Sequence, residues 1–208
     1  MKEEILPIVL DIETSGIDKV KCGIWQIGAI DLNNLKEQFL EEAKIDNEDI
    51  VLNAGKRTLF EVIGKTEEQF RDKNKQSQKQ MLKNFFEWVN KKPMKNFLCQ
   101  NPQFDVTFLD IKAKKYNLEM PFHYRSFDTH SIAQLKYYDL NKKFLVKDGH
   151  SDMGLTNILK LCGMEDNRQA HNALEDCKLT GECFSRLIYG KNLFSEYIQF
   201  KIPLYLTK

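Results

Sequence analysis

Net charge is almost absent from this sequence, because 31 Lys and Arg residues oppose 30 Asp and Glu residues and leave +1 at pH 7. A polycation that binds nucleic acid through bulk charge is therefore excluded, and any phosphate-binding surface must be local. The segment from Lys56 to Lys95 is locally basic. An ordinary solvated helix face accounts for this segment more simply than a dedicated binding patch.

Membrane-spanning and exported proteins carry apolar segments that this sequence lacks. No apolar run approaches the ~20 residues that a membrane span needs, and no signal peptide precedes the first predicted strand. The five cysteines are odd in number and include no C-x-x-C pair, so a disulfide framework and a zinc site are both disfavoured. We therefore expect an intracellular, cytoplasmic protein with reduced thiols and no membrane partner.

Internal repeats, low-complexity segments and a convincing domain linker are also lacking over the 208 residues. At roughly 150 residues per domain, this length fits a single domain, and a hydrophobic content of 42% can form its core. We expect one domain over residues 1–208, with a core of residues 5–190. A C-terminal tail, residues 191–208, is expected to pack on the core or to dock a partner.

Hydrophobic periodicity predicts a succession of strands and helices. Strands are expected at Ile5–Ile12, Trp25–Leu32, Glu37–Ile45, Phe97–Cys99 and Tyr124–Phe127, and helices at Gln78–Asn90, Asp105–Tyr116, Asp128–Tyr138, Leu155–Leu161 and Asn172–Tyr189. Residues 46–76 are expected to be irregular with one short helix, and residues 139–154 to form a loop. The first three strands have short connections and therefore predict an antiparallel meander. A meander followed by alternating strands and helices indicates an α/β domain with a mixed sheet.

Two acids interrupt the first apolar strand, in the run IVLDIET at residues 8–14. Side chains two residues apart in a strand point to the same face, so Asp11 and Glu13 project together. Adjacent carboxylates repel each other and resist desolvation, and a divalent cation between them would keep both ionised. Alternatively, the two acids merely end the strand in a turn. The choice depends on whether other acids arrive at the same place.

Three further candidate residues occur later in the chain. Asp105 follows the strand Phe97–Cys99, near the carboxyl end where open α/β sheets bind ligands, although Asp is also a common helix N-cap. His171 is expected in the loop before the last long helix, with Asp176 one turn into that helix, so that both could face one cleft. A surface His and a solvated Asp are the alternative.

The order and spacing of these five residues resemble those of the DEDDh exonucleases, the DnaQ-like branch of the ribonuclease-H-like fold. Residues 11–16 (DIETSG) are similar to the family motif D-x-E-T-[ST]-G, residues 101–109 (NPQFDVTFL) to N-x-x-F-D-x-x-F-L, and residues 171–176 (HNALED) to H-x-A-x-x-D. Residues 127–129 (FDT), followed by a predicted helix, are a further landmark. The resemblance implies a mixed five-stranded sheet flanked by helices.

The resemblance also implies an activity, that of a 3′-to-5′ exonuclease which releases nucleoside 5′-monophosphates with two divalent cations, Mg²⁺ or Mn²⁺. In the family pattern Asp11 bridges both ions, Glu13 and Asp176 bind the ion that carries the attacking water, and Asp105 holds the other ion. His171 is then the general base, because an unperturbed imidazole pKa of about 6.5 lets it accept a proton near neutral pH.

Two residues of the first motif are expected to bind the 3′-terminal nucleotide of the substrate. Thr14 would do so through its hydroxyl group, and Gly16 would permit close approach of the backbone. The sequence departs from the family pattern at Gln26, where many members have Glu, and at Gln100, where His often precedes the Asn. Neither position supplies a metal ligand in the family, so we expect activity to be retained.

The motifs leave the polymer open between DNA and RNA. Expected partners are single-stranded or frayed 3′ ends, with DNA slightly favoured as for a proofreading epsilon subunit, and a polymerase or another replication or repair protein. Alternatives are trimming of RNA ends, degradation of oligoribonucleotides and, least favoured, a non-catalytic subunit that binds nucleic acid or a protein. His123, His130 and His150 are expected to be structural or surface residues, and Phe104 to pack in the core.

Overall fold

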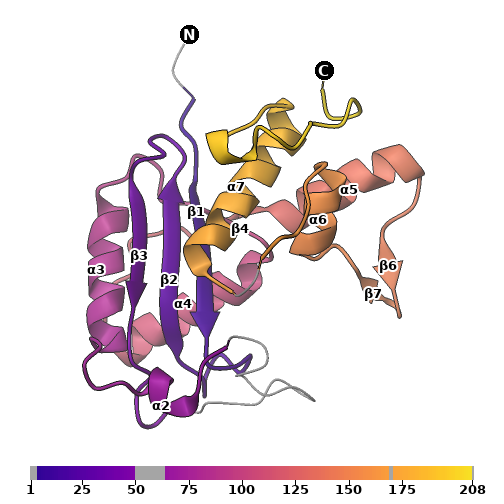
Figure 1. The fold of residues 1–208 in the computed structure, drawn as a ribbon. Coiled ribbons are helices and arrows are strands. Elements are labelled where there is room, and N and C mark those ends of the chain that lie inside the picture. Colours follow the sequence, from indigo (N-terminus) through magenta and orange to yellow (C-terminus); the bar gives the residue numbers. More distant parts are fainter. Residues whose placement is uncertain (1–3, 50–63, 169–170, 208) are drawn as a thin grey trace.

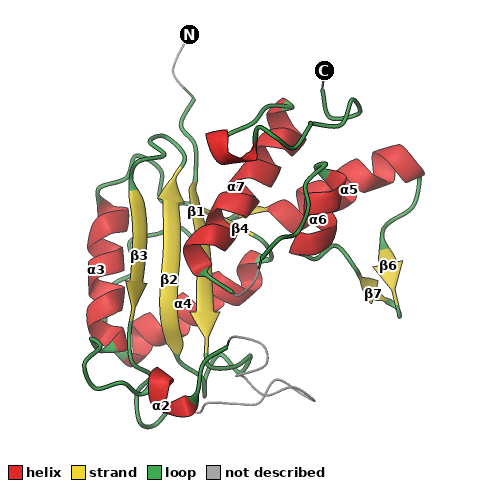
Figure 2. Ribbon diagram, in the orientation of Figure 1, coloured by secondary structure: helices red, strands yellow, loops and turns green. Residues whose placement is uncertain are grey.

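The computed structural model describes residues 4–49, 64–168 and 171–207. Its strands are β1 (Ile8–Thr14), β2 (Ile24–Asp31), β3 (Gln38–Glu42), β4 (Phe97–Cys99), β5 (Phe127–Asp128), β6 (Val146–Lys147) and β7 (His150–Ser151). Its helices are α2 (Glu67–Phe70), α3 (Gln78–Asn90), α4 (Pro102–Lys115), α5 (Thr129–Asn141), α6 (Leu155–Leu161) and α7 (Ala173–Tyr189), followed by the 3₁₀ helix η1 (Ser195–Tyr197). Figure 1 shows their arrangement in chain order, and Figure 2 shows them by type.

The first five strands form one mixed sheet in the order β3-β2-β1-β4-β5. β1 pairs antiparallel with β2, and β2 with β3, which confirms the predicted meander. β4 pairs parallel with the other edge of β1, and β5 pairs parallel with β4. The predicted α/β fold, a mixed five-stranded sheet with flanking helices, is confirmed.

The boundaries of β1 differ from the predicted strand Ile5–Ile12. Backbone pairing begins at Ile8, after a proline that has no N–H to donate. It continues through Asp11 opposite Gly28 and Glu13 opposite Gln26. Both acids therefore lie within a paired strand, and the alternative in which they merely end it in a turn is wrong.

Alternation along β1 divides the apolar core between the two faces of the sheet. Ile8, Leu10 and Ile12 are buried with residues of α3 and α4, whereas Val9 is buried with residues of α7 on the opposite face (Figure 1). The apolar residues of α3 are buried as their spacing predicts: Met81, Leu82, Phe85, Phe86 and Val89. The two acids of β1 share the face of Val9, so they point to the side of the sheet that α7 covers.

α4 begins three residues before the predicted start at Asp105. Asn101 has the left-handed φ of 67°, a conformation that Asn adopts more readily than most residues, and Pro102 occupies the first turn, where its missing N–H is harmless. Asp105 therefore lies within the first turn of the helix instead of at its first residue, and the N-cap is Asn101. Asp128 caps α5, which continues to Asn141 instead of ending at Tyr138.

The loop predicted for residues 139–154 is wrong in part, because β6 and β7 form a hairpin there. Its two-residue turn, Asp148-Gly149, has positive φ at both positions, 51° and 78°, as a type I′ turn requires. Asp-Gly between short runs of strand-forming residues is a hairpin signal. The sequence therefore contained a local signal for the hairpin, the Asp-Gly pair, which the predicted loop did not take into account.

The C-terminal tail returns to α7. Phe194 and Leu206 are buried. Arg186 of α7 is fully buried, and its guanidinium donates to the carbonyl oxygen of Tyr197 at 2.9 Å. Its buried partner Glu182 receives a hydrogen bond from Arg186 at 2.7 Å and another from the N–H of Phe194 at 2.9 Å. Both members of this ion pair thus hold the tail, while the assignment of the whole chain to one domain stays a prediction.

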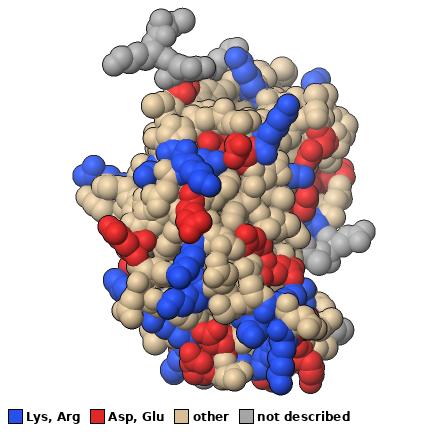
Figure 3. Space-filling model, turned by 90° about the vertical axis from the view of Figure 1, so that its left-hand side faces the viewer, with Lys and Arg blue, Asp and Glu red and all other residues tan. Residues whose placement is uncertain are grey.

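Charges of both signs are interspersed over the side of the molecule that carries α3 (Figure 3). Lys65 and Lys75 pair with Glu42, and Lys92 pairs with Glu37. These three lysines of the locally basic segment are therefore paired with acids, and residues 56–63 lie outside the described residues. Within the ranges that the structure describes, no helix has the length and apolar character needed to cross a membrane.

Candidate active site

The N-terminus of α7 lies directly on β2 because the residue beneath it is a glycine. A Cβ atom on Gly28 would lie 2.4 Å from the carbonyl carbon of Ala173 and would collide with the helix backbone. Gln26, two residues earlier in β2, accepts a hydrogen bond from the N–H of Ala173 at 2.8 Å. The amide nitrogen of Gln26 donates to Glu42 of β3 at 3.1 Å. These contacts determine where α7 begins, and therefore where residues 171–176 lie.

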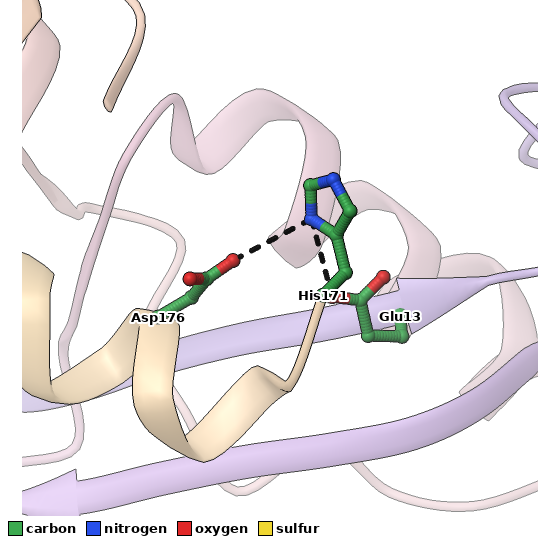
Figure 4. Close-up of side chains that lie close together, drawn as sticks. All are labelled: Glu13, His171 and Asp176. Atoms are coloured by element: carbon green, nitrogen blue, oxygen red, sulfur yellow. Dashed lines mark ion pairs between the residues drawn. The ribbon is translucent and has the colours of Figure 1, made fainter. Parts of the chain in front are cut away.

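The start of α7 brings His171 and Asp176 to Glu13 of β1. Asn172 caps the helix by accepting hydrogen bonds from the N–H groups two and three residues later, at 3.1 and 3.2 Å. His171 therefore precedes the helix, and Asp176 lies in its first turn, as predicted. The His171 Nδ1 atom lies 3.7 Å from a carboxylate oxygen of Glu13 and 3.7 Å from one of Asp176 (Figure 4). Ligand atoms of all three residues lie within 4.8 Å of one another.

Asp105 reaches the same place from α4. Its Oδ1 atom accepts a hydrogen bond at 3.2 Å from the N–H of Ile12, the residue between the two acids of β1. The N–H of Asn101, at the start of α4, donates to Asp128 at 3.1 Å and so links this turn to the cap of α5. Asn101, the first residue of the second motif, therefore has a structural role. Its left-handed conformation reverses the chain, so that the first turn of α4 meets β1.

A cavity of about 390 Å³ lies where these elements meet. All five predicted catalytic residues line it: Asp11, Glu13, Asp105, His171 and Asp176. The other two predicted site residues are not among its lining residues, and the hydroxyl of Thr14 donates to the carbonyl oxygen of Gly16 at 2.8 Å. A role for Thr14 and Gly16 in substrate binding stays a prediction.

The cavity disfavours negative charge. Burial raises the pKa of Glu13 and that of Asp105 to about 7. Burial, and then the charges of Asp105 and Glu13, raise the pKa of Asp11 well above its usual value. The carboxylate of Asp176, and then that of Glu13, raise the pKa of His171. These carboxyl groups therefore need an external positive charge if all of them are to be ionised at neutral pH.

Arg168 supplies part of that charge, and the sequence analysis missed it. Its guanidinium donates to the two carboxylate oxygens of Asp176 at 3.1 and 3.3 Å. It also donates to both oxygens of Asp166, each at 2.8 Å, in a bidentate pair that fixes its orientation. The sequence signal was an Arg three residues before His171, two residues after an acid that it could pair with.

Phe104 and the two glutamines that depart from the family pattern also contribute to the site. The ring of Phe104 packs on Phe108, with centroids 5.0 Å apart, but it also lines the cavity, so the prediction of a core residue is only partly correct. The early start of α4 explains this, because it places Phe104 in the first turn beside Asp105. Gln26 holds the start of α7, and Gln100 lines the cavity and donates to the carbonyl oxygen of Met153 at 3.4 Å.

The donor atoms of the cavity fit divalent metal ions. Carboxylate oxygens are the ligands that Mg²⁺ and Mn²⁺ prefer, and the cavity presents four carboxyl groups: Asp11, Glu13, Asp105 and Asp176. Their raised pKa values have the same cause that makes a cation favourable here, namely buried negative charge with too little compensation. The chemistry that this arrangement can support is therefore metal-assisted hydrolysis.

Comparison with known proteins gives a match over most of the chain. The family model RNase_T, whose description is Exonuclease, matches residues 8–184. Ribonuclease T of Vibrio parahaemolyticus is 26% identical over 207 residues, which cover 88% of this chain and 85% of that protein.

Solved structures with the same arrangement of strands and helices include two nucleases. The nuclease domain of 3′hExo, a DEDDh family member bound to rAMP, has a TM-score of 0.65 and 16% identity over 94% of each chain. E. coli Exonuclease I in complex with a dT13 oligonucleotide has a TM-score of 0.65 and 16% identity, over 86% of this chain and 40% of that one. At such identities the likeness concerns the fold alone, and it agrees with the mixed sheet described above.

Proposed function

The chain belongs to the Exonuclease family of the RNase_T model and is a 3′-to-5′ exonuclease, and on this premise we propose that it trims the 3′ ends of single-stranded RNA. The convergence of Asp11, Glu13, Asp105, His171 and Asp176 on one cavity carries the proposal. The choice of RNA is supported by relatives named Ribonuclease T, which match 88% of the chain. DNA, which was slightly favoured in the sequence analysis by likeness to a proofreading subunit, has no such support.

The proposed reaction is hydrolysis of the last phosphodiester bond. A water molecule attacks the phosphorus atom, and the bond from phosphorus to the 3′ oxygen of the preceding nucleotide breaks. A nucleoside 5′-monophosphate leaves, and the 3′ oxygen of the shortened strand takes a proton from solvent water to become a hydroxyl group. His171 takes the proton from the water, since its half-exposed imidazole lies on the loop before α7 and beside two of the acids.

Members of this family use divalent metal ions, and we propose two, Mg²⁺ or Mn²⁺, for this chain. Asp11, Glu13, Asp105 and Asp176 would hold them. Such ions, when bound, activate water and stabilise negative charge on the leaving oxygen. Thr14 and Gly16, which follow the acids at the end of β1, are proposed to contact the terminal nucleotide.

The test compares 5′-labelled single-stranded RNA and DNA of matched sequence, with Mg²⁺ or Mn²⁺ and with EDTA. We expect a ladder that shortens from the 3′ end, is faster on RNA, and disappears with EDTA. Asp11→Asn and His171→Ala should each lower the rate by at least about 100-fold, the usual scale for loss of a catalytic group. Glu87→Ala, an exposed acid of α3, is the matched control and should have no effect.

DNA is the second candidate substrate, because the solved structures that share this fold include E. coli Exonuclease I with a dT13 oligonucleotide. Faster shortening of the DNA strand in the same assay would replace RNA by DNA as the proposed substrate. Absence of cleavage of either polymer, with binding retained, would instead favour the non-catalytic subunit. A polymerase or another replication or repair protein as partner, and a cytoplasmic location, stay predictions.

A further inference from the structure

A second hollow, of about 520 Å³, lies between α5 and the hairpin of β6 and β7, and we call it the hairpin groove. Its apolar lining is unusually open to solvent, since Leu135, Phe144 and Val146 are 64%, 55% and 56% exposed. Figure 1 shows the hairpin projecting away from the sheet. Exposed apolar side chains gathered in one hollow mark an interaction surface.

The hairpin groove is built in advance of any ligand. Gln134 of α5 is buried, and its amide nitrogen donates to the carbonyl oxygen of Leu145 at 2.9 Å and to the hydroxyl of Ser151 at 2.6 Å. Its amide oxygen accepts from the N–H of Leu145 at 3.1 Å. The ring of His130 contacts the same Ser151 hydroxyl at 2.7 Å. These hydrogen bonds hold the hairpin of β6 and β7, which buries little surface of its own. Its position is therefore determined by α5.

Two sets of hydrogen bonds link the groove to the catalytic cavity. The Asp128 carboxylate accepts hydrogen bonds at 3.1 Å from the N–H of His130 and from the N–H of Asn101. His130 lines the groove, and Asn101 lines the catalytic cavity. Gln100, another lining residue of the cavity, donates to Met153, two residues after the hairpin. Residues at the edge of the cavity are therefore bonded to residues at the edge of the groove, which makes the groove the candidate surface for a strand whose 3′ end lies in the cavity.

The side chains of the groove suit single-stranded nucleic acid. None of its described lining residues is acidic, and His130, Ser131 and His150 offer polar groups beside the aromatic ring of Phe144. Two exposed lysines lie close to these residues in the chain, Lys147 in β6 and Lys143 in the segment between α5 and β6. Unpaired bases stack on aromatic rings, and lysines attract the phosphates between them.

We propose that the hairpin groove binds the single-stranded body of the substrate, on the 5′ side of the nucleotide held in the active site. This inference rests on the proposed exonuclease function. It gives a role to His130 and His150, which the sequence analysis left without one. It also explains how a chain with a net charge of +1 can bind a polyanion. The groove contacts only a short stretch of the strand, and part of that contact is stacking of bases on an aromatic ring.

The test measures how the effect of a groove substitution depends on substrate length. Phe144→Ser is compared with wild type on a dinucleotide and on a single strand of about 20 nucleotides, as RNA and as DNA. One lost stacking contact should raise KM for the long strand by about 5- to 100-fold, with kcat and the dinucleotide rate unchanged. Leu204→Ser, which removes an 80% exposed side chain from the tail, is the matched control.

A charge test is independent of the aromatic ring. Lys143→Gln combined with Lys147→Gln should lower the slope of log KM against log salt for the long strand by about 1.4, from about 0.7 per lost phosphate contact on single strands. Lys79→Gln combined with Lys83→Gln, on the exposed side of α3, is the matched control and should leave the slope unchanged.

Equal loss on both substrate lengths, or no loss on either, would overturn the proposal. If the wild-type protein cleaves neither polymer, the proposed function is wrong, and the proposal for the groove is then tested by a binding measurement. In that case, affinity of an Asp11→Asn protein for a labelled strand should fall at least 5-fold on adding Phe144→Ser. An unchanged affinity together with a change in oligomeric mass would assign the groove to a second copy or a protein partner instead.

Discussion

At the scale of single residues, the cavity of the proposed active site holds more buried carboxyl groups than its positively charged side chains can balance. Asp176 has Arg168 beside it, whereas Asp11 has Asp105 and Glu13 as its strongest charged neighbours. Burying these carboxylates is unfavourable, and the raised pKa values show it. The apolar core on the same sheet supplies the stability that offsets this destabilisation. A site of this kind is prepared for cations before any cation arrives.

The first prediction concerns pH and metal removal. Glu13 and Asp105 have pKa values of about 7 in the folded protein, above the usual 4.5 and 3.8. A pKa raised by folding contributes stability below the unfolded value and loses it as pH rises through the folded value. The metal-free protein should therefore become less stable between pH 4 and 7, by about 3–4 kcal/mol per group.

Thermal unfolding in EDTA at pH 5 and pH 8 checks this expectation, with a Tm lower at pH 8 by about 5–15 °C. Addition of Mn²⁺ should restore the Tm at pH 8 and should have little effect at pH 5, where these carboxyl groups are protonated. Glu13→Gln should reduce both the pH dependence and the response to Mn²⁺. A metal-free Tm that is the same at both pH values would contradict the account.

At the scale of elements, the contact between β2 and α7 determines the geometry of the site. Gly28 permits the helix backbone to lie against the strand, and Gln26 holds the first N–H of the helix. Cys177, one turn further along, donates its thiol to the carbonyl oxygen of Gly28 at 3.1 Å. The acids of β1 and the residues at the start of α7 are thus aligned by a neighbouring strand that supplies none of the catalytic groups.

Gly28→Ala tests this alignment. The added methyl group would lie 2.4 Å from the backbone of Ala173, so α7 must move and carry His171 and Asp176 with it. We expect a loss of about 1–3 kcal/mol in stability, the scale of overpacking, and a fall in kcat of about 100-fold from misplaced catalytic groups.

Gly154→Ala is the matched control, since a Cβ at Gly154 meets nothing within 4 Å. It should leave kcat unchanged and alter stability by at most about 0.5 kcal/mol. Steady-state kinetics and chemical denaturation measure both variants. If the Gly28→Ala variant had the same kcat as the wild type, α7 could move without affecting the reaction, and the account would be wrong.

At the scale of the whole molecule, a buried ion pair joins the tail to α7. Arg186 and Glu182 are both fully buried, and each also binds the backbone of the tail. Removal of one member leaves a buried charge without its partner, which is strongly destabilising. The tail therefore belongs to the stability of the fold, and the site lies at the other end of α7.

Arg186→Met should lower the free energy of unfolding by about 3–5 kcal/mol, the scale for breaking a buried pair. The activity per folded molecule should be preserved at a temperature below the lowered Tm. Lys178→Met is the control, because its partners Glu175 and Glu196 are exposed, and it should cost less than about 1 kcal/mol. Equal effects of the two variants, measured by urea unfolding, would show that the buried pair has no special role.

Local patterns in the chain predicted the meander, α3, β4 and α6, and they placed the proposed catalytic residues on the elements where the structure has them. This succeeded because strand alternation, helix spacing and helix caps act over a few residues. The boundaries of β1 and α4 were harder to predict, because Pro7 and Asn101 act through backbone conformation and pairing with distant strands. The hairpin was missed although its Asp-Gly turn is a local signal.

What a single reading along the chain could not provide is the set of contacts between distant segments. Gln26 holds the N–H of Ala173 across a separation of 147 residues, and Arg168 turns toward Asp176 through a pairing with Asp166. The motifs of the sequence supplied the proposed catalytic residues, and local patterns placed them on the elements that carry them. Tertiary packing alone decided that they share one cavity, that Arg168 enters it, and that hydrogen bonds link the hairpin groove to it, because these outcomes depend on how whole elements pack together.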